Sequence, residues 1–352
     1  MFKATDKITI NDVAKASGVS KGTVDRVLHN RGEVSRKTRE KVLKVVDELG
    51  FKPNIYASML ASQKDRVIQC VIPEYQGGDF WSITAKGIDE ASEMVSHYGI
   101  KVSKLLYDQY DSEAFQTVCD GILADPPAGV LIAPIFRAKT IKFVKELAAR
   151  QIPYIILDSK LEDDNYLAYF GMPMYQSGYL CADLLTNGTV PEKIYIVRIR
   201  RDKKGLSDPT VSRRTGFLDY IGEHCPETEI VNLVIDPNST ESIDCVMDEA
   251  LLKDASCKHI VMFNSRVHLV ADYLRRRGLK DCRVVGFDFL EKNLQALKSD
   301  HVQLLIAQHT DMHTVSAVRA MSDYLIFGKI PTRRDNYTQM DILNKLNCDY
   351  YL

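Results

Sequence analysis

Several features that mark other protein classes are missing from this chain of 352 residues. No stretch reaches the roughly 18 apolar residues that a membrane-spanning helix needs. The N-terminal sequence MFKATDK has no apolar run of the secretory type, so we expect a cytoplasmic protein without membrane contact. The eight cysteines are scattered without a Cys-x-x-Cys pair. That scatter favours free thiols over a disulfide framework or a zinc site.

Motifs of catalysis are missing as well. The eight histidines include no H-E-x-x-H setting, and no G-x-x-x-x-G-K phosphate loop occurs. A sugar kinase, for example, would need a glycine-rich loop to hold phosphates. We therefore expect a protein that is not an enzyme and that uses no metal or cofactor.

Net charge is close to zero, at −1, but it is unevenly distributed. Residues 1–66 hold 14 Lys and Arg against 8 Asp and Glu, whereas the rest of the chain holds 32 against 39. A basic N-terminal segment on an acidic body fits a nucleic-acid-binding head joined to another unit. At this length the chain can hold two or three domains.

The basic segment has the pattern of three amphipathic helices. Apolar residues recur at helical spacing over residues 10–16, 24–28 and 42–49. Between the first two runs, Gly18 can adopt the left-handed conformation that ends a helix, and Ser20 can cap the next one. This spacing predicts a helix-turn-helix whose second helix begins at Lys21. A three-helix bundle that binds nothing would show the same periodicity.

The residues of this segment resemble a known signature. The pattern T-I-x-D-V-A-K-x-x-G-V-S-x-x-T-V-x-R-V-L, followed by V-S-x-x-T-R-E-K-V, is similar to the N-terminus of the lactose-repressor family of bacterial regulators. The resemblance implies operator DNA as a partner, read by two heads of a homodimer on a near-palindrome. Asp25 departs from the serine usual in the family, so we expect a different operator preference.

The resemblance also implies a set of DNA-contacting residues. Arg26 can pair with a guanine edge, and Lys21 with a base or a phosphate. Residues 54–62 match the family's hinge helix, in which the leucine at position 60 wedges between base pairs of the minor groove; a plain linker is the alternative. The predicted set is Thr9, Ile10, Ser20, Lys21, Gly22, Thr23, Asp25, Arg26, His29, Ser35, Asn54, Ala57 and Leu60.

From Val67 the pattern changes to short apolar strands alternating with helices, which predicts doubly wound parallel α/β structure. Landmarks such as Gly87-Ile88 and Gly216-Phe217 repeat at an offset of about 129, which suggests two similar lobes. This part resembles the periplasmic sugar-binding-protein fold of type I, most like the ribose-binding type. Ligands of such lobes bind between them, at the carboxyl ends of the strands.

The expected fold is therefore a helical head with a hinge helix, followed by two α/β lobes. We predict the head at 1–53 and the hinge or linker at 54–65. The first lobe is expected at 66–166 and 309–334, and the second at 167–308 and 335–352. The role of the last residues, from Asn347 on, is left open.

Aromatic and acidic side chains follow several of the predicted strands. Phe80 and Trp81 stand where the ribose-binding type has its stacking pair, although core packing is the alternative for either ring. Asp158 and Asp288 end strands, where a carboxylate can accept hydrogen bonds from two hydroxyl groups. The family's sugar binders often have Arg after the first of these, whereas this chain has Ser159.

Three further polar residues complete the predicted effector site. Arg213 matches the family spacing R-x-x-G-F, with Arg214 as its competitor; Asn264 ends a strand, and Gln308 fits the family's A-Q crossover. Guanidinium, amide and carboxylate groups around aromatic rings suit a neutral polyol. We expect a sugar-like effector that modulates DNA binding; a solute-binding protein, an enzyme fused to a DNA head, or a regulator for a non-sugar ligand such as a purine are the alternatives.

Overall fold

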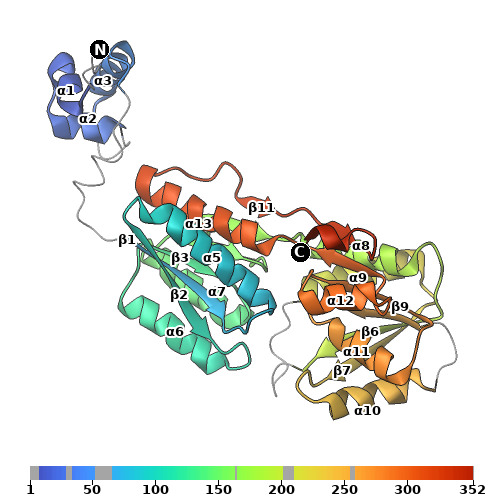
Figure 1. Ribbon diagram of the computed structural model, residues 1–352. Coiled ribbons are helices and arrows are strands. Elements are labelled where there is room, and N and C mark those ends of the chain that lie inside the picture. Colours follow the sequence, from blue (N-terminus) through green and yellow to red (C-terminus); the bar gives the residue numbers. More distant parts are fainter. Residues whose placement is uncertain are drawn as a thin grey trace, which may run out of the picture.

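The computed structural model describes residues 8–28, 34–51, 66–162, 165–200, 210–253 and 258–351. Figure 1 shows its elements in chain order, with a helical N-terminal part and two α/β lobes. His29, Asn54, Ala57 and Leu60, which were predicted to contact DNA, lie outside the described residues, as does the predicted hinge helix.

The head contains α1 (Ile10–Ser17), α2 (Lys21–Leu28) and α3 (Arg36–Glu48). As predicted, Gly18 ends α1 in the left-handed conformation, with φ +64°. The Ser20 hydroxyl accepts a hydrogen bond from the Thr23 amide at 3.2 Å, which caps α2. The three helices meet around buried valines at positions 13, 24 and 42.

Two apolar side chains within the periodic apolar runs of the head lie outside its core. Ala16 is exposed, and Leu43 is 47% exposed. Ser17 takes the buried place on α1, where its hydroxyl donates to the Val13 carbonyl at 2.6 Å. That bond satisfies the hydroxyl inside the helix, so a polar residue is accommodated in the core.

The first lobe is built on a six-stranded sheet with the order β11-β5-β4-β3-β1-β2. Its inner strands are continuous apolar runs because helices cover both faces of a parallel sheet. The strands are β1 (Arg66–Pro73), β2 (Ile100–Tyr107), β3 (Gly129–Ile132), β4 (Tyr154–Leu157), β5 (Ala168–Gly171) and β11 (Asp335–Tyr337). The helices that follow in this lobe are α5 (Phe80–Ser96), α6 (Ser112–Ala124), α7 (Arg137–Ala149) and α13 (Thr310–Phe327).

The second lobe repeats this order as β12-β10-β9-β8-β6-β7. Strand β12 pairs antiparallel with β10, whereas the other pairings between described strands are parallel. The strands are β6 (Lys193–Ile199), β7 (Glu229–Ile235), β8 (Lys258–Met262), β9 (Cys282–Phe287), β10 (Leu304–Ala307) and β12 (Asp341–Leu343). Its helices are α8 (Met174–Thr186), α9 (Val211–His224), α10 (Thr240–Leu251), α11 (His268–Arg277) and α12 (Glu291–Lys298).

The chain crosses between the sheets after β5, after β10 and between β11 and β12. Strand β11 pairs with β5, so residues 168–171 and 335–337 belong to the first sheet. This corrects the predicted lobe boundaries at 167 and 335. Residues 335–343 form two short strands in different sheets, because the chain leaves the first sheet at Thr338–Met340.

Glycines mark the closest helix contacts in both lobes. A Cβ at Gly87 would lie 2.6 Å from the Asp311 carbonyl oxygen of α13, and one at Gly216 would lie 2.0 Å from that of Tyr175 on α8. The two repeated glycines noted in the sequence therefore serve the same purpose, which is to let a helix backbone approach its neighbour.

Candidate functional site: a cleft between the lobes

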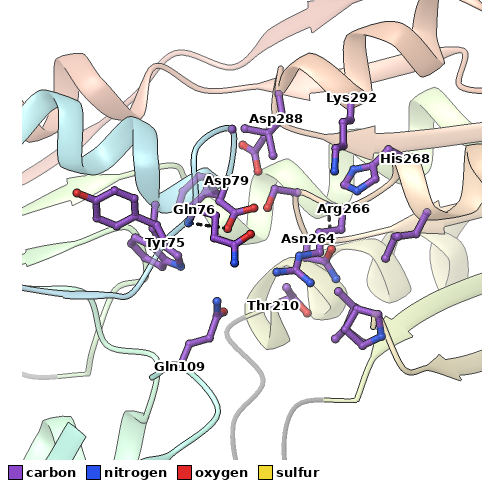
Figure 2. A pocket seen from close by; sticks show the side chains of 18 of the residues that line it. Tyr75, Gln76, Asp79, Gln109, Thr210, Asn264, Arg266, His268, Asp288 and Lys292 are labelled. Carbon is purple, nitrogen blue, oxygen red and sulfur yellow. Dashed lines mark hydrogen bonds between the residues drawn. The ribbon is translucent and has the colours of Figure 1, made fainter. Parts of the chain in front are cut away.

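A cleft of about 760 Å³ lies between the two lobes and is lined by both. Loops that follow the carboxyl ends of strands in each sheet surround it, at the edge where ligands of open α/β sheets bind. All seven side chains predicted as effector contacts line this cleft: Phe80, Trp81, Asp158, Arg213, Asn264, Asp288 and Gln308. Figure 2 shows part of the lining, with Asp288 and Asn264 beside residues that the sequence did not single out.

The aromatic pair lies in the first turn of α5, which begins at Phe80. Trp81 is only 7% exposed and packs within the first lobe's core, whereas Phe80 is half-buried. Their rings meet edge to face, with centroids 4.9 Å apart. Phe80 therefore offers more ring surface to the cleft, and Trp81 supports it from behind.

Asp158 and Asp288 occupy matching places in the two lobes. Each directly follows a strand, β4 or β9, and each has a left-handed backbone, with φ +64° and +66°. Asp is among the few residue types that tolerate this region, and the bend turns its carboxylate away from the strand direction. Asp158 accepts a hydrogen bond from the Ser159 hydroxyl at 3.0 Å, and Asp288 accepts one from the Gln308 side-chain amide at 3.1 Å.

The Asp288 carboxyl is buried, with 5% of the residue exposed. Burial raises the pKa of Asp288 to about 6, because loss of water penalises the charged form; the positive charge of Arg213 and the Gln308 amide oppose this rise. Asp288 is therefore ionised at neutral pH but can gain a proton under mildly acidic conditions.

Arg213 is also buried, in the first turn of α9. Its Nε donates to the Ser177 hydroxyl at 3.0 Å, and one terminal nitrogen donates to the Phe263 carbonyl. The other terminal nitrogen meets the sulfurs of Met172 and Met174 at 3.3 Å. Most of the donors that were expected to face the ligand are therefore held by the protein.

The environment of Arg213 explains how its charge is tolerated. The guanidinium stacks over the Phe287 ring at 3.8 Å from the centroid. Burial lowers the pKa of Arg213, and the negative charges of Asp288 and Asp158 oppose that shift. Arg214, the alternative from the sequence, is half-buried and does not line the cleft.

Sequence reasoning missed several polar residues of the cleft. They lie in loops or helix starts that follow strand ends, so proximity to strand ends was the usable signal: Gln76, Asp79, Gln109, Thr210, Arg266, His268 and Lys292. Asn264 was predicted as a ligand contact, but its side-chain oxygen accepts the Arg266 amide at 3.0 Å and so shapes its own loop.

In the head, the N-terminal end of α2 presents a polar, accessible surface. Lys21, Gly22 and Arg26 are exposed, and Thr23 and Asp25 are half-buried. The Arg26 Nε donates to the Gly22 carbonyl at 3.2 Å, which aligns the guanidinium along α2.

The remaining predicted DNA contacts of the head are accounted for by local structure. The Thr9 hydroxyl donates to the Asp12 carboxylate at 2.7 Å, and the Ser35 hydroxyl accepts the Thr38 amide at 3.3 Å. Ile10 is half-buried against the head's core. Thr9 and Ser35 are exposed at helix starts, and the hydroxyl of each already has one intramolecular partner.

Within the described ranges, no group of three or more His, Cys, Asp and Glu side chains could hold a metal ion. None of the helices placed in those same ranges is both long and apolar enough to cross a membrane.

Comparisons with known proteins agree with this arrangement. The model of bacterial regulatory proteins of the lacI family matches residues 9–54, and that of the periplasmic binding protein domain matches residues 69–330. A crystal structure described as a LacI transcriptional regulator from Bacteroides fragilis is 32% identical, with a TM-score of 0.77, over 82% of this chain and 100% of that one.

Two other similar proteins extend the comparison. The HTH-type transcriptional regulator DegA of Bacillus subtilis is 33% identical over 43% of this chain, and the match spans only 44% of DegA. A carbohydrate transporter solute-binding protein from Agrobacterium radiobacter, solved with D-arabinose, is 22% identical with a TM-score of 0.68. It covers 81% of this chain and 96% of that one, and it shows the fold alone.

The fold and the cleft thus define a two-lobed unit of the periplasmic-binding-protein type, joined to a helix-turn-helix head. The chain belongs to the lacI family of bacterial regulatory proteins, the family whose N-terminal signature the sequence resembles.

Proposed function

We propose that this protein is a sequence-specific DNA-binding transcriptional regulator, a repressor, controlled by a sugar or sugar derivative in the interlobe cleft. The observation that carries the proposal is the joint presence of an exposed α2 terminus and a polar cleft lined by both lobes. In the proposal, a cytoplasmic homodimer reads a near-palindromic operator with its two heads. It performs no catalysis and needs no cofactor.

The cleft chemistry supports a polyol. Asp158, Asp288 and Gln308 offer acceptors and donors at the base of the cleft, and Phe80 offers a ring face to C–H groups. A ligand that fits one arrangement of the lobes better than another shifts operator affinity by a coupling of about 1–3 kcal/mol. The arabinose-bound solute-binding protein of the same fold supports the sugar class by analogy.

The DNA part of the proposal is tested by selection from a random duplex pool. We expect the protein to enrich a near-palindromic sequence and to lose affinity for it steeply as salt rises. Arg26→Ala should weaken binding to the selected duplex by about 10- to 100-fold, the effect of one base-edge pair. Lys44→Ala, which removes an equal charge from an exposed part of α3, should change affinity much less.

A pool that yields no preferred sequence would contradict the regulator and favour a solute-binding protein. Equal losses for Arg26→Ala and Lys44→Ala would show that only the charge of the head matters, and would contradict base reading by α2.

The ligand part is tested by thermal shift with monosaccharides, disaccharides, purines and amino acids. A true ligand should raise the melting temperature through mass action, by about 2.7 kcal/mol of stability at a hundredfold excess over Kd. Asp158→Ala should abolish the shift. A shift from a purine with none from any sugar would replace the sugar class by the purine alternative.

A further inference from the structure

Two cations of the cleft, both in the second lobe, have side chains without a hydrogen-bond or ion-pair partner in the part of the chain that the structure describes. Arg266 is half-buried between β8 and α11, and Lys292 is exposed in the first turn of α12. Both side chains line the cleft, as Figure 2 shows. Among the described residues, neither side chain forms a hydrogen bond or an ion pair. Arg213, the third cation of the lining, is held by protein groups on most of its donors.

Most carboxylates of the cleft, unlike these two cations, already have a hydrogen-bond partner. Five of them already accept a hydrogen bond from a neighbouring residue: Asp79, Asp108, Asp158, Asp288 and Glu291. In the first two cases the donor is a loop amide, so the carboxylate shapes its own loop. Glu74 is the exposed exception on the opposite wall. The acids keep their negative charge, but most of them have an acceptor atom engaged, whereas Arg266 and Lys292 keep their donors available on the second-lobe wall.

A buried amide orders the segments of chain that carry the two cations. His268 lies between them and begins α11, and its Nδ1 is 3.0 Å from the Asn293 side-chain oxygen. Asn293 is fully buried and also donates to the carbonyls of Ser265, Phe287 and Asp288. This one amide therefore ties the loops after β8 and β9 together. The N-terminal ends of α11 and α12 contribute further positive potential.

We propose that Arg266 and Lys292 form a subsite for an anionic group of the effector, a carboxylate or a phosphate. The effector is then an acidic sugar, with its polyol body against Phe80, Asp158 and Asp288 and its acid on the second-lobe wall. His268 supplies a neutral hydrogen-bonding group there, because burial lowers its pKa. The polyol body rests on the proposed function, whereas the anion subsite rests on the two cations alone.

The subsite is first tested without any sugar, by thermal shift of the full chain with inorganic phosphate against chloride at equal ionic strength. We expect phosphate to raise the melting temperature of the unaltered protein. The increment should disappear in Arg266→Gln and in Lys292→Gln. It should persist in Arg214→Gln and in Lys280→Gln, which remove the same charges from the second lobe outside the cleft. Equal increments in all five proteins would reflect general salt exclusion and would overturn the subsite.

The second arm uses matched sugars, each offered as the neutral form, the sugar acid and the sugar phosphate. We expect the acidic member of a pair to bind more tightly, with the preference falling by about 10- to 100-fold in Arg266→Gln, as for a charged hydrogen bond. If Arg266→Gln weakens binding of the sugar acid more than binding of the sugar phosphate, the anionic group is a carboxylate. The opposite order indicates a phosphate. A neutral sugar that binds best, with affinity unchanged in Arg266→Gln, would overturn the proposal.

The same arm separates the subsite from ion pairing across the closed cleft. If Arg266 instead pairs with Glu74 when the lobes close, Arg266→Glu should weaken every ligand equally. Glu74→Arg in the same chain should then restore binding, and this outcome would overturn the subsite. A phosphate effect with no binding of any sugar leaves the anion subsite standing and contradicts the sugar class of the proposed function.

Discussion

The two lobes have the same strand order but very different walls toward the cleft. The first lobe presents an aromatic pair and carboxylates, and its lining contains no Lys or Arg among the described residues. The second lobe holds a buried Arg213 and carries the other two cations, Arg266 and Lys292. The shared backbone places Asp158 and Asp288 at equivalent, left-handed positions. The topology thus fixes where functional groups stand, and the side chains of each lobe decide what they recognise.

The largest expected effect concerns the helix crossing that both lobes share. Gly216→Val should prevent stable folding of the second lobe, because its Cβ would meet the Tyr175 carbonyl at 2.0 Å and backbone cannot yield cheaply. Gly87→Val should cost less in the first lobe, since its nearest atom lies at 2.6 Å. Urea unfolding measures both.

Gly222→Ala is the matched control on α9, because nothing lies within 4 Å of that position. It should stabilise the chain by about 0.5–1 kcal/mol, the helix-propensity difference. Similar unfolding midpoints for Gly216→Val and Gly222→Ala would show that the close contact has no energetic importance.

The two aromatic residues of the first wall should separate stability from binding. Trp81→Ala should lower the free energy of unfolding by about 3–5 kcal/mol, as expected for a buried large ring. Phe80→Ala should cost clearly less stability, because the ring is half-buried, but should weaken effector binding. Thermal unfolding and ligand titration of the two variants check this. The reverse order of stability losses would contradict the assignment of Trp81 to the core.

The buried carboxyl of Asp288, on the second-lobe wall, should make the free energy of unfolding depend on pH. The folded pKa of Asp288, about 6, lies above the ordinary value of 3.8, so the folded state binds this proton more tightly than the unfolded state. The resulting stabilisation is complete below the unfolded pKa and is lost as pH rises through about 6, by about 3 kcal/mol at most.

Asp288→Asn removes this titration and keeps a neutral side chain that tolerates the same backbone. Its free energy of unfolding relative to that of the unaltered protein should therefore rise as pH increases from about 4 to 7. Urea unfolding at several pH values measures this difference. Other groups that titrate in this range are common to both proteins and cancel in the difference. Parallel profiles would show that Asp288 does not titrate there.

The smallest effects should be equal in the two lobes. Asp111 caps α6 by accepting the Glu113 amide at 2.8 Å, and Ser239 caps α10 in the same place of the second lobe by accepting the Ser242 amide at 3.1 Å. Replacing either by Ala should cost about 1 kcal/mol in thermal unfolding. Unequal costs would show that the structural repeat does not extend to helix capping.

The positions of the cleft residues could be predicted because short apolar runs identify the strands. The residues that follow parallel strands converge at one sheet edge. The partners of the cleft residues could not be predicted. Arg213 is held by Met172, Met174 and Ser177, about 40 positions earlier in the chain. Sulfur and hydroxyl groups carry no sequence signal for receiving a guanidinium, and only the packing of α8 on α9 brings them there.

The apolar periodicity of the head likewise predicted only part of its structure. It gave the three helices and the turn at Gly18, because these depend on neighbours in the chain. It did not show that Leu43 is exposed and Ser17 buried, because burial depends on which side of a helix meets the other two. A hydroxyl that bonds to its own helix can occupy a core position that an apolar pattern assigns elsewhere.

The crossings between the lobes have a consequence for synthesis on the ribosome. Helix α13 and strand β11 of the first lobe are translated after nearly all of the second. Until then the nascent first sheet keeps strand β5 as an unpaired border, which is the kind of surface that recruits strands from other polypeptides. The three described helices of the N-terminal head lie within residues 10–48, so this part can mature as soon as it emerges. Protection of the nascent first lobe by a chaperone is therefore most needed late in elongation, just before β11 arrives.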